Sequence, residues 1–114
     1  MGFMEGDFDA KTHMCLIYQS EAERRSLIEP FIVAASDDND RVEYFYDEWS
    51  ADDMRRALSK YGIDAKAAEK SGQIRLRHTA TVYHPKQVFA PEAMWQTLCD
   101  CYDCGLRDGF ARVR

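Results

Sequence analysis

The spacing of hydrophobic residues changes several times along this 114-residue chain, and four segments have the spacing expected of β-strands. Residues Thr12–Tyr18 form a nearly continuous apolar run, which is typical of a strand covered on both faces. Val42–Tyr46 predicts a second strand. Residues 73–78 alternate, with apolar side chains on one face and arginines on the other, as in a half-exposed third strand. Residues 110–114 indicate the beginning of a fourth.

Segments with helical periodicity separate these strands. The first helix is expected to begin at Glu21 and to carry one apolar stripe of Leu27, Phe31 and Ala34, widened by Ile28 and Ala35. A second helix follows Ser50, whose spacing to Asp53 resembles a capping box, and Gly62 ends it. Asp64 is expected to cap a short third helix that ends near Gly72.

A last helix is predicted from Pro91, which suits the first helical turn, to Gly105. The order of elements is therefore β-α-β-α-β-α-β. This order predicts an α/β fold with a three-layered, mostly parallel sheet. Residues 1–11 are polar and are expected to form a flexible N-terminal tail, which leaves residues 12–114 for a single domain.

Composition narrows the range of partners and compartments. The formal net charge is −5, and the basic side chains are scattered, so direct binding to nucleic acid is disfavoured. The first residues lack the pattern of a signal peptide, and no apolar run is long enough to span a membrane. We therefore expect a cytoplasmic protein whose four cysteines are reduced thiols.

Short motifs along the chain follow one another in the order found in a known family. They are His13-x-Cys15-x-x-Tyr18, Pro30-Phe31, Leu58-x-x-x-Gly62-Ile63-Asp64, Ser71-Gly72-Gln73-Ile74, Tyr83, Phe89-x-Pro91-x-x-Met94, Gly105 and a final arginine-containing strand. Together they resemble the MEDS domain, the methanogen/methylotroph DcmR sensory domain, along residues 12–114.

The resemblance implies a RecA-like or KaiC-like core without the machinery for nucleotide hydrolysis. It also implies a sensory role, the detection of hydrocarbon derivatives, in a family whose members occur alone or beside signalling and DNA-binding domains. Signal transduction and transcription regulation are therefore expected contexts. The chain departs from the family pattern at Ser36–Asp40, where a turn with Gly and Glu is expected. It also ends at Arg114, where the family continues, so a C-terminally truncated form is expected.

The segment after the first predicted strand argues against nucleotide hydrolysis. A P-loop needs glycines that expose backbone N–H groups to phosphate and a Lys that reaches the β/γ oxygens. This chain instead reads Tyr18-Gln19-Ser20-Glu21-Ala22-Glu23, with carboxylates that repel phosphate. We therefore predict a non-catalytic domain without a cofactor.

Five residues are predicted to contact a small ligand. His13 and Cys15 lie two apart on one strand, so their side chains share a face, roughly 6.5 Å apart along the backbone. A soft metal would suit this pair, but a buried histidine beside a small apolar thiol is the favoured alternative. Tyr18 lies nearest the carboxyl end of this strand, where parallel α/β sheets bind ligands. His78 and Tyr83, at the end of the third strand and in its loop, complete the set.

The cysteines of the last helix do not form a metal-binding pattern. At about 100° per residue, Cys101 falls beside Met94 and Leu98 on the predicted core stripe. Cys99 and Cys104 then lie on opposite flanks, about 140° apart. Three thiols in this arrangement do not converge on one ion, so no metal is predicted.

Three functional readings follow from these observations. The leading one is a regulatory domain that binds a small, hydrocarbon-derived ligand and signals through a partner protein. The alternatives are a protein-interaction or dimerisation module without a ligand, and a thiol- or metal-dependent enzyme. A homodimer is also predicted, because a strand ending at Arg114 leaves backbone groups open to pairing with a second copy. Trp49, Trp95 and Tyr102 are expected to be core or interface aromatics.

Overall fold

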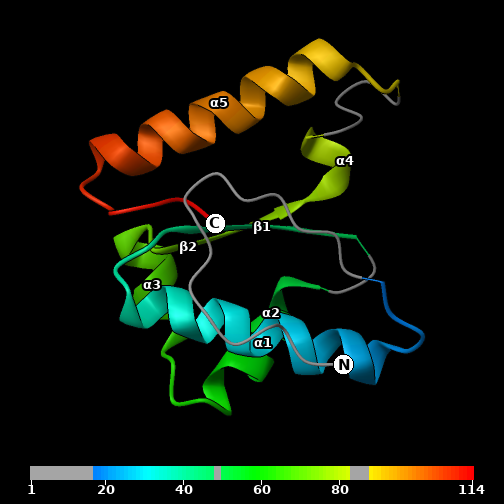
Figure 1. Ribbon diagram of the computed structural model, residues 1–114, viewed down its shortest axis with the longest axis vertical. Coiled ribbons are helices and arrows are strands. Elements are labelled where there is room, and N and C mark those ends of the chain that lie inside the picture. Colours follow the sequence, from blue (N-terminus) through cyan, green and yellow to red (C-terminus); the bar gives the residue numbers. More distant parts are fainter. Residues whose placement is uncertain (1–16, 48–49, 83–87) are drawn as a thin grey trace.

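The protein has a mixed α/β fold in the computed structural model, which describes residues 17–47, 50–82 and 88–114 (Figure 1). Its elements are α1 (Glu21–Asp37), β1 (Val42–Tyr46), α2 (Ala51–Ser59), α3 (Ala65–Ser71), β2 (Ile74–His78), α4 (Thr79–Val82) and α5 (Pro91–Arg107). The predicted helices and the second and third predicted strands are confirmed, with ends that shift by three residues at most. The short helix α4 was not predicted.

The residues at the helix starts explain where the chain turns helical. Ser20 and Asp64 cap α1 and α3, because each side chain accepts a hydrogen bond from a backbone N–H one turn into its helix. Ser50 and Asp53 form the predicted capping box at the start of α2. Pro91 occupies the first turn of α5, where its missing N–H costs no hydrogen bond.

The two strands lie in parallel register, from the Val42–Ile74 pair to the Tyr46–His78 pair. An isolated parallel bridge joins Arg41 to Val113, so the chain after α5 continues the sheet on the other edge of β1. The predicted parallel pairing is therefore confirmed within the described residues. Most of the strand predicted at residues 12–18 lies outside them, and a larger three-layered sheet stays a prediction.

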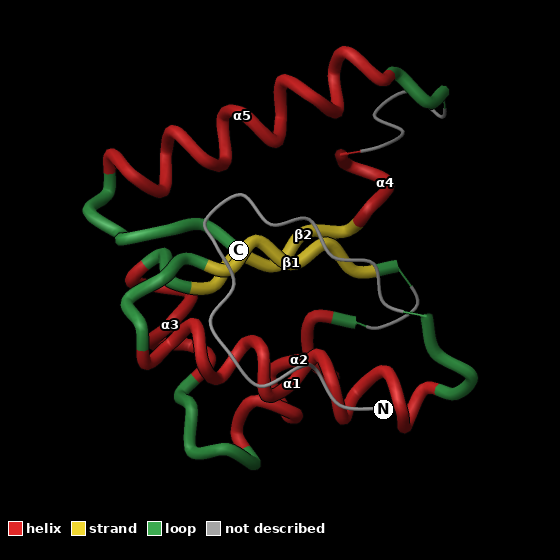
Figure 2. Tube along the Cα trace, in the orientation of Figure 1, coloured by secondary structure: helices red, strands yellow, loops and turns green. Residues whose placement is uncertain are grey.

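Helices lie on both sides of the strands: α1, α2 and α3 on one side and α5 on the other (Figures 1 and 2). The apolar core fills the space between the strands and α1–α3. Its buried members are Ile32, Ala35, Val42, Met54, Ala57, Leu58, Ala65, Ala68 and Ile74. No helix in the described part of the chain is both long and apolar enough to cross a membrane.

Of the apolar stripe predicted for α1, the widening residues Ile28 and Ala35 contact the core, and Ile32, which was not predicted, joins them. The buried residues are Ile32 and Ala35, with Ile28 packed against the core, whereas Ala34 is exposed. The series Leu27–Phe31–Ala34 and Ile28–Ile32–Ala35 both have helical spacing, so the sequence alone does not choose between them. The packing of α1 against α2 and the strands selects the second series.

Charged residues join the opposite side of the sheet to α5 and to the C-terminal segment. Arg41 is buried, donates to the Gly72 carbonyl through Nε at 2.7 Å, and pairs with Asp108 at the end of α5. Gly105 lies so close to Val113 that an added Cβ would stand 2.4 Å from its Cγ2 atom. A residue without a side chain at position 105 is therefore what allows the C-terminal segment to pack beneath α5.

Candidate functional site

A cleft of about 290 Å³ opens at the carboxyl end of β1. Its lining comes from the start of α1 and from the last part of β1, and consists of Tyr18, Glu21, Arg24, Tyr44, Phe45, Tyr46 and Asp47. Ligands of open α/β sheets bind beyond the carboxyl ends of parallel strands, and this cleft occupies that position. It is therefore the candidate site.

The first turn of α1 is fixed by reciprocal hydrogen bonds. The Ser20 hydroxyl accepts from the Glu23 backbone N–H at 3.2 Å, and the Glu23 carboxylate accepts from the Gln19 N–H at 2.8 Å. These contacts satisfy backbone donors that the helix start leaves without intrahelical partners. They hold the segment just after Tyr18 in one conformation at the mouth of the cleft.

Arg24 connects the start of α1 to β1 across the cleft. Its Nε and Nη2 atoms donate to the Glu21 carboxylate, with Nη2 at 2.9 Å, and its Nη1 donates to the Tyr44 hydroxyl at 2.9 Å. The hydrogen bond from Arg24 lowers the pKa of Glu21. The same carboxylate raises the pKa of the Arg24 guanidinium, so both groups stay charged at neutral pH.

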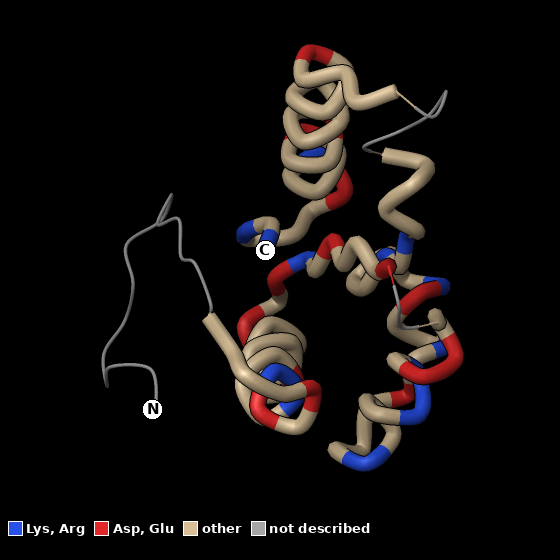
Figure 3. The backbone as a smooth tube through the Cα atoms, turned by 90° about the vertical axis from the view of Figure 1, so that its right-hand side faces the viewer, with Lys and Arg blue, Asp and Glu red and all other residues tan. Residues whose placement is uncertain are grey.

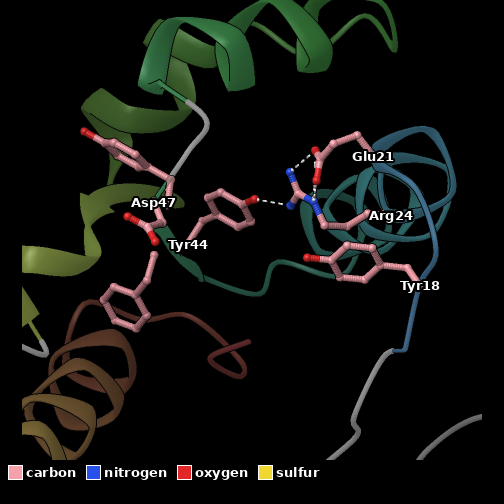
Figure 4. A pocket seen from close by; sticks show the side chains of 7 residues that line it. Tyr18, Glu21, Arg24, Tyr44 and Asp47 are labelled. Atoms are coloured by element: carbon pink, nitrogen blue, oxygen red, sulfur yellow. Dashed lines mark hydrogen bonds and ion pairs between the residues drawn. The ribbon is translucent and has the colours of Figure 1, made fainter.

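Four of the seven residues that line the cleft are aromatic. Figure 4 shows the rings of Tyr18 and Tyr44 extending toward one another from α1's side and from β1, with Arg24 beside them. Phe45 and Tyr46 continue the wall along the strand, and Asp47 follows its carboxyl end. The lining therefore offers flat apolar faces together with hydroxyl, guanidinium and carboxylate groups. Such a mixture binds small organic molecules and orients their polar atoms.

The structure brings two of the five predicted ligand residues to this end of the sheet. Tyr18 lines the cleft. His78 does not line the cleft but packs edge-on against the ring of Tyr46, with the ring centroids 5.4 Å apart. Its Nδ1 accepts from the Ala80 backbone N–H at 3.1 Å. His13, Cys15 and Tyr83 lie outside the described residues.

Most of the lining was not predicted from the sequence. Two signals in it were available: Glu21 and Arg24 have the i, i+3 spacing of a helical ion pair, and Asp47 directly follows a predicted strand. The link between Arg24 and Tyr44 joins residues 20 positions apart and depends on how α1 packs on β1.

The thiols of α5 lie away from this cleft and in different surroundings. Cys101 is buried as predicted, whereas Cys99 and Cys104 are partly exposed. Burial, followed by the nearby Glu43 carboxylate, raises the pKa of Cys101. Cys104 lies beside Asp108 and Arg41. Within the described residues, no three histidine, cysteine or acidic side chains are grouped to hold a metal ion.

Parallel strands with helices on both sides and a cleft at the carboxyl end of β1 define a small α/β domain. The model of one family, the methanogen/methylotroph DcmR sensory domain, matches residues 12–114. The chain therefore belongs to the MEDS family of sensory domains. No curated protein and no solved structure matches it.

Proposed function

We propose that this domain is a non-catalytic sensor that binds a small organic molecule in the cleft at the carboxyl end of β1. The observation that carries the proposal is the aromatic lining of that cleft, which includes Tyr18 and Tyr44. Membership of a sensory family supports the same reading. The RecA-like or KaiC-like core implied by the family, in a cytoplasmic protein, would supply the scaffold.

The lining favours a small ligand with an apolar body and one polar or weakly cationic group. Three tyrosines and a phenylalanine are among the lining residues, and Arg24 is already paired with Glu21. Asp47 adds a second carboxylate, so the charged lining groups total one cation and two anions. A strongly anionic ligand is therefore disfavoured, and an alcohol, an amine or another hydrocarbon derivative fits.

Ligand binding would reach the rest of the domain through the Arg24–Tyr44 hydrogen bond. This contact joins α1 to the strand, and Tyr44 also packs against the apolar core. A ligand polar group that competes for the Tyr44 hydroxyl would release Arg24 and loosen α1 from β1. A partner protein that contacts α1 would then distinguish the two states, as in any two-state switch.

Thermal-shift and calorimetric titration with short-chain alcohols, alkylamines and alkyl halides test the proposal. At least one compound should raise the melting temperature in a saturable manner, because binding only the folded state stabilises it. Tyr18→Ala should weaken that binding by about tenfold or more, as loss of an aromatic anchor does.

Tyr61→Ala is the matched control, since Tyr61 has the same exposed fraction as Tyr18, 46%, and does not line the cleft. It should leave the affinity unchanged. The proposal fails if no compound of the three classes binds, or if Tyr18→Ala and Tyr61→Ala affect binding equally.

A further inference from the structure

Exposed apolar side chains are concentrated on and just before α5. Among the described residues, nine large hydrophobic side chains are exposed, and six of them lie between positions 88 and 106. Four are on the helix itself: Trp95 (67%), Leu98 (38%), Tyr102 (51%) and Leu106 (41%). Leu98, which was predicted to lie on the core stripe, borders the buried positions Cys101 and Gly105 and is the least exposed of the four. Trp95 and Tyr102 lie further toward the solvent side of the helix.

These four residues form one stripe along the helix, which we call the α5 stripe. Their spacings of three and four residues keep them on a single face, because an α-helix turns about 100° per residue. The buried positions Cys101 and Gly105 lie on the side that faces the strands and Val113. Figures 1 and 3 show α5 as the outermost helix on its side of the sheet.

We propose that the α5 stripe pairs in antiparallel orientation with the α5 stripe of a second copy of this chain. The stripe has its midpoint between Leu98 and Tyr102, with Trp95 and Leu106 at similar distances on either side. A two-fold axis through that midpoint brings Trp95 of one copy opposite Leu106 of the other, and Leu98 opposite Tyr102. Each aromatic ring then meets an aliphatic side chain, and the surface is complementary to itself.

The charges beside the stripe favour the antiparallel orientation. Glu92 in the first turn and Arg107 in the last are both exposed. They lie on the same flank, at about 60° and about 120° from Trp95 around the helix. Antiparallel pairing brings Glu92 of each copy to the end of the interface where Arg107 of the other lies, whereas parallel pairing leaves Glu92 and Arg107 at opposite ends of the interface. The helix dipoles also oppose one another in the antiparallel arrangement.

The size of the stripe sets the expected strength of the dimer. Large aromatic side chains bury 150–250 Å² each when fully covered, so this partly exposed stripe offers roughly 400 Å² per copy. A stable interface of standard size buries about 800 Å² per partner. We therefore expect a weak, reversible dimer, with Trp95 and Tyr102 as its main anchors.

Sedimentation equilibrium of the full chain over micromolar concentrations tests the pairing. The native chain should show a reversible monomer–dimer equilibrium. Leu98→Glu should weaken it by about tenfold or more, because two carboxylates are then brought close to the two-fold axis. Ile17→Glu is the control, since it places the same charge on another exposed apolar residue (83% exposed) away from α5. It should leave the equilibrium unchanged, and far-UV circular dichroism should show both variants folded.

Charge reversal tests the orientation. Glu92→Lys and Arg107→Glu should each weaken the dimer by about threefold to tenfold, since each creates two like-charge pairs. The double variant should recover the native affinity. A monomer at every concentration, a dimer indifferent to Leu98→Glu, or a double variant without recovery would each overturn the proposal.

Discussion

The helices α1–α3 and the helix α5 cover opposite sides of the same two strands, but different forces hold them there. The α1–α3 side is an apolar core in which Ile32, Met54 and Leu58 are almost completely buried. On the α5 side, Glu43 is nearly buried between Arg75 and Arg77. The Arg77 guanidinium also approaches the Cys101 sulfur at 3.4 Å.

The C-terminal segment is held in the same ionic manner. Asp40 is fully buried and accepts from Arg112 at 3.1 Å and from Arg114 at 2.6 Å, while Asp38 pairs with both arginines from the surface. Burial of apolar area supplies most of the stability of a domain, whereas an ion pair gains little after its desolvation cost. The comparison therefore indicates that α5 and the C-terminal segment are the less strongly held part of the molecule.

The largest expected effect comes from the same substitution made on the two sides. Leu58→Ala should lower the free energy of unfolding by about 3 kcal/mol, because it leaves a cavity in a fully buried position. Leu98→Ala, on the exposed face of α5, should cost less than about 1 kcal/mol. Urea unfolding followed by circular dichroism measures both, and equal losses would remove the distinction between the two sides.

Asp40 and Asp38 offer a matched pair, because both bind Arg112 and Arg114. Asp40→Ala should cost about 2 kcal/mol, since a buried carboxylate is lost while the two arginines can still reach water or Asp38. Asp38→Ala removes a half-exposed partner and should cost less than about 1 kcal/mol. The same urea experiment separates them, and a larger loss in Asp38→Ala would contradict the role of burial.

Gly105→Ala tests how closely the C-terminal segment packs under α5. The new methyl group would approach the Val113 Cγ2 atom to 2.4 Å, and we expect a net loss of about 1 kcal/mol after the gain in helix propensity. Val113→Ala removes the opposing atom, so Gly105→Ala should be neutral or stabilising in that background. A double-mutant cycle by thermal unfolding measures this coupling, and purely additive effects would mean that the contact does not matter.

The smallest expected effect is a dependence on acid pH at the end of α5. The hydrogen bond from Arg41 lowers the pKa of Asp108, so the pair stabilises the fold above the unfolded-state pKa of about 4. That contribution is lost as the pH falls through the lowered folded-state pKa. Asp108→Asn should therefore unfold more easily than the native chain at neutral pH, and the difference should shrink in acid.

Urea midpoints of the native chain and of Asp108→Asn, measured from neutral pH to below pH 4, test this convergence. A constant difference between the native chain and Asp108→Asn at all pH values would contradict the assignment.

Part of the candidate site was accessible from the sequence, and part was not. Tyr18 was predicted as a ligand residue because it lies near the carboxyl end of an expected strand, and the structure places it in the cleft. Arg24, Tyr44 and Tyr46 were missed, since nothing local brings the first turn of α1 to β1. The ligand-binding roles of all five predicted residues stay predictions, and His13, Cys15 and Tyr83 lie outside the described ranges.

Local chemistry determined the elements of this protein. The Ser50–Asp53 capping box, the Asp64 cap, the left-handed Gly72 and Pro91 at a helix start each act within a few residues, so the sequence shows them directly. The alternation of residues 73–78 likewise identified the faces of β2. The family resemblance was also present in the order of these short motifs.

Only the tertiary structure decided which surfaces meet. It chose the Ile28–Ile32–Ala35 side of α1 for the core, buried Asp40 and Arg41 against distant partners, and left the α5 stripe exposed. Helical spacing gives each helix several apolar faces, and a charge is buried only where the fold brings its partner close. Both outcomes depend on contacts between residues far apart in the chain, so local patterns do not contain them.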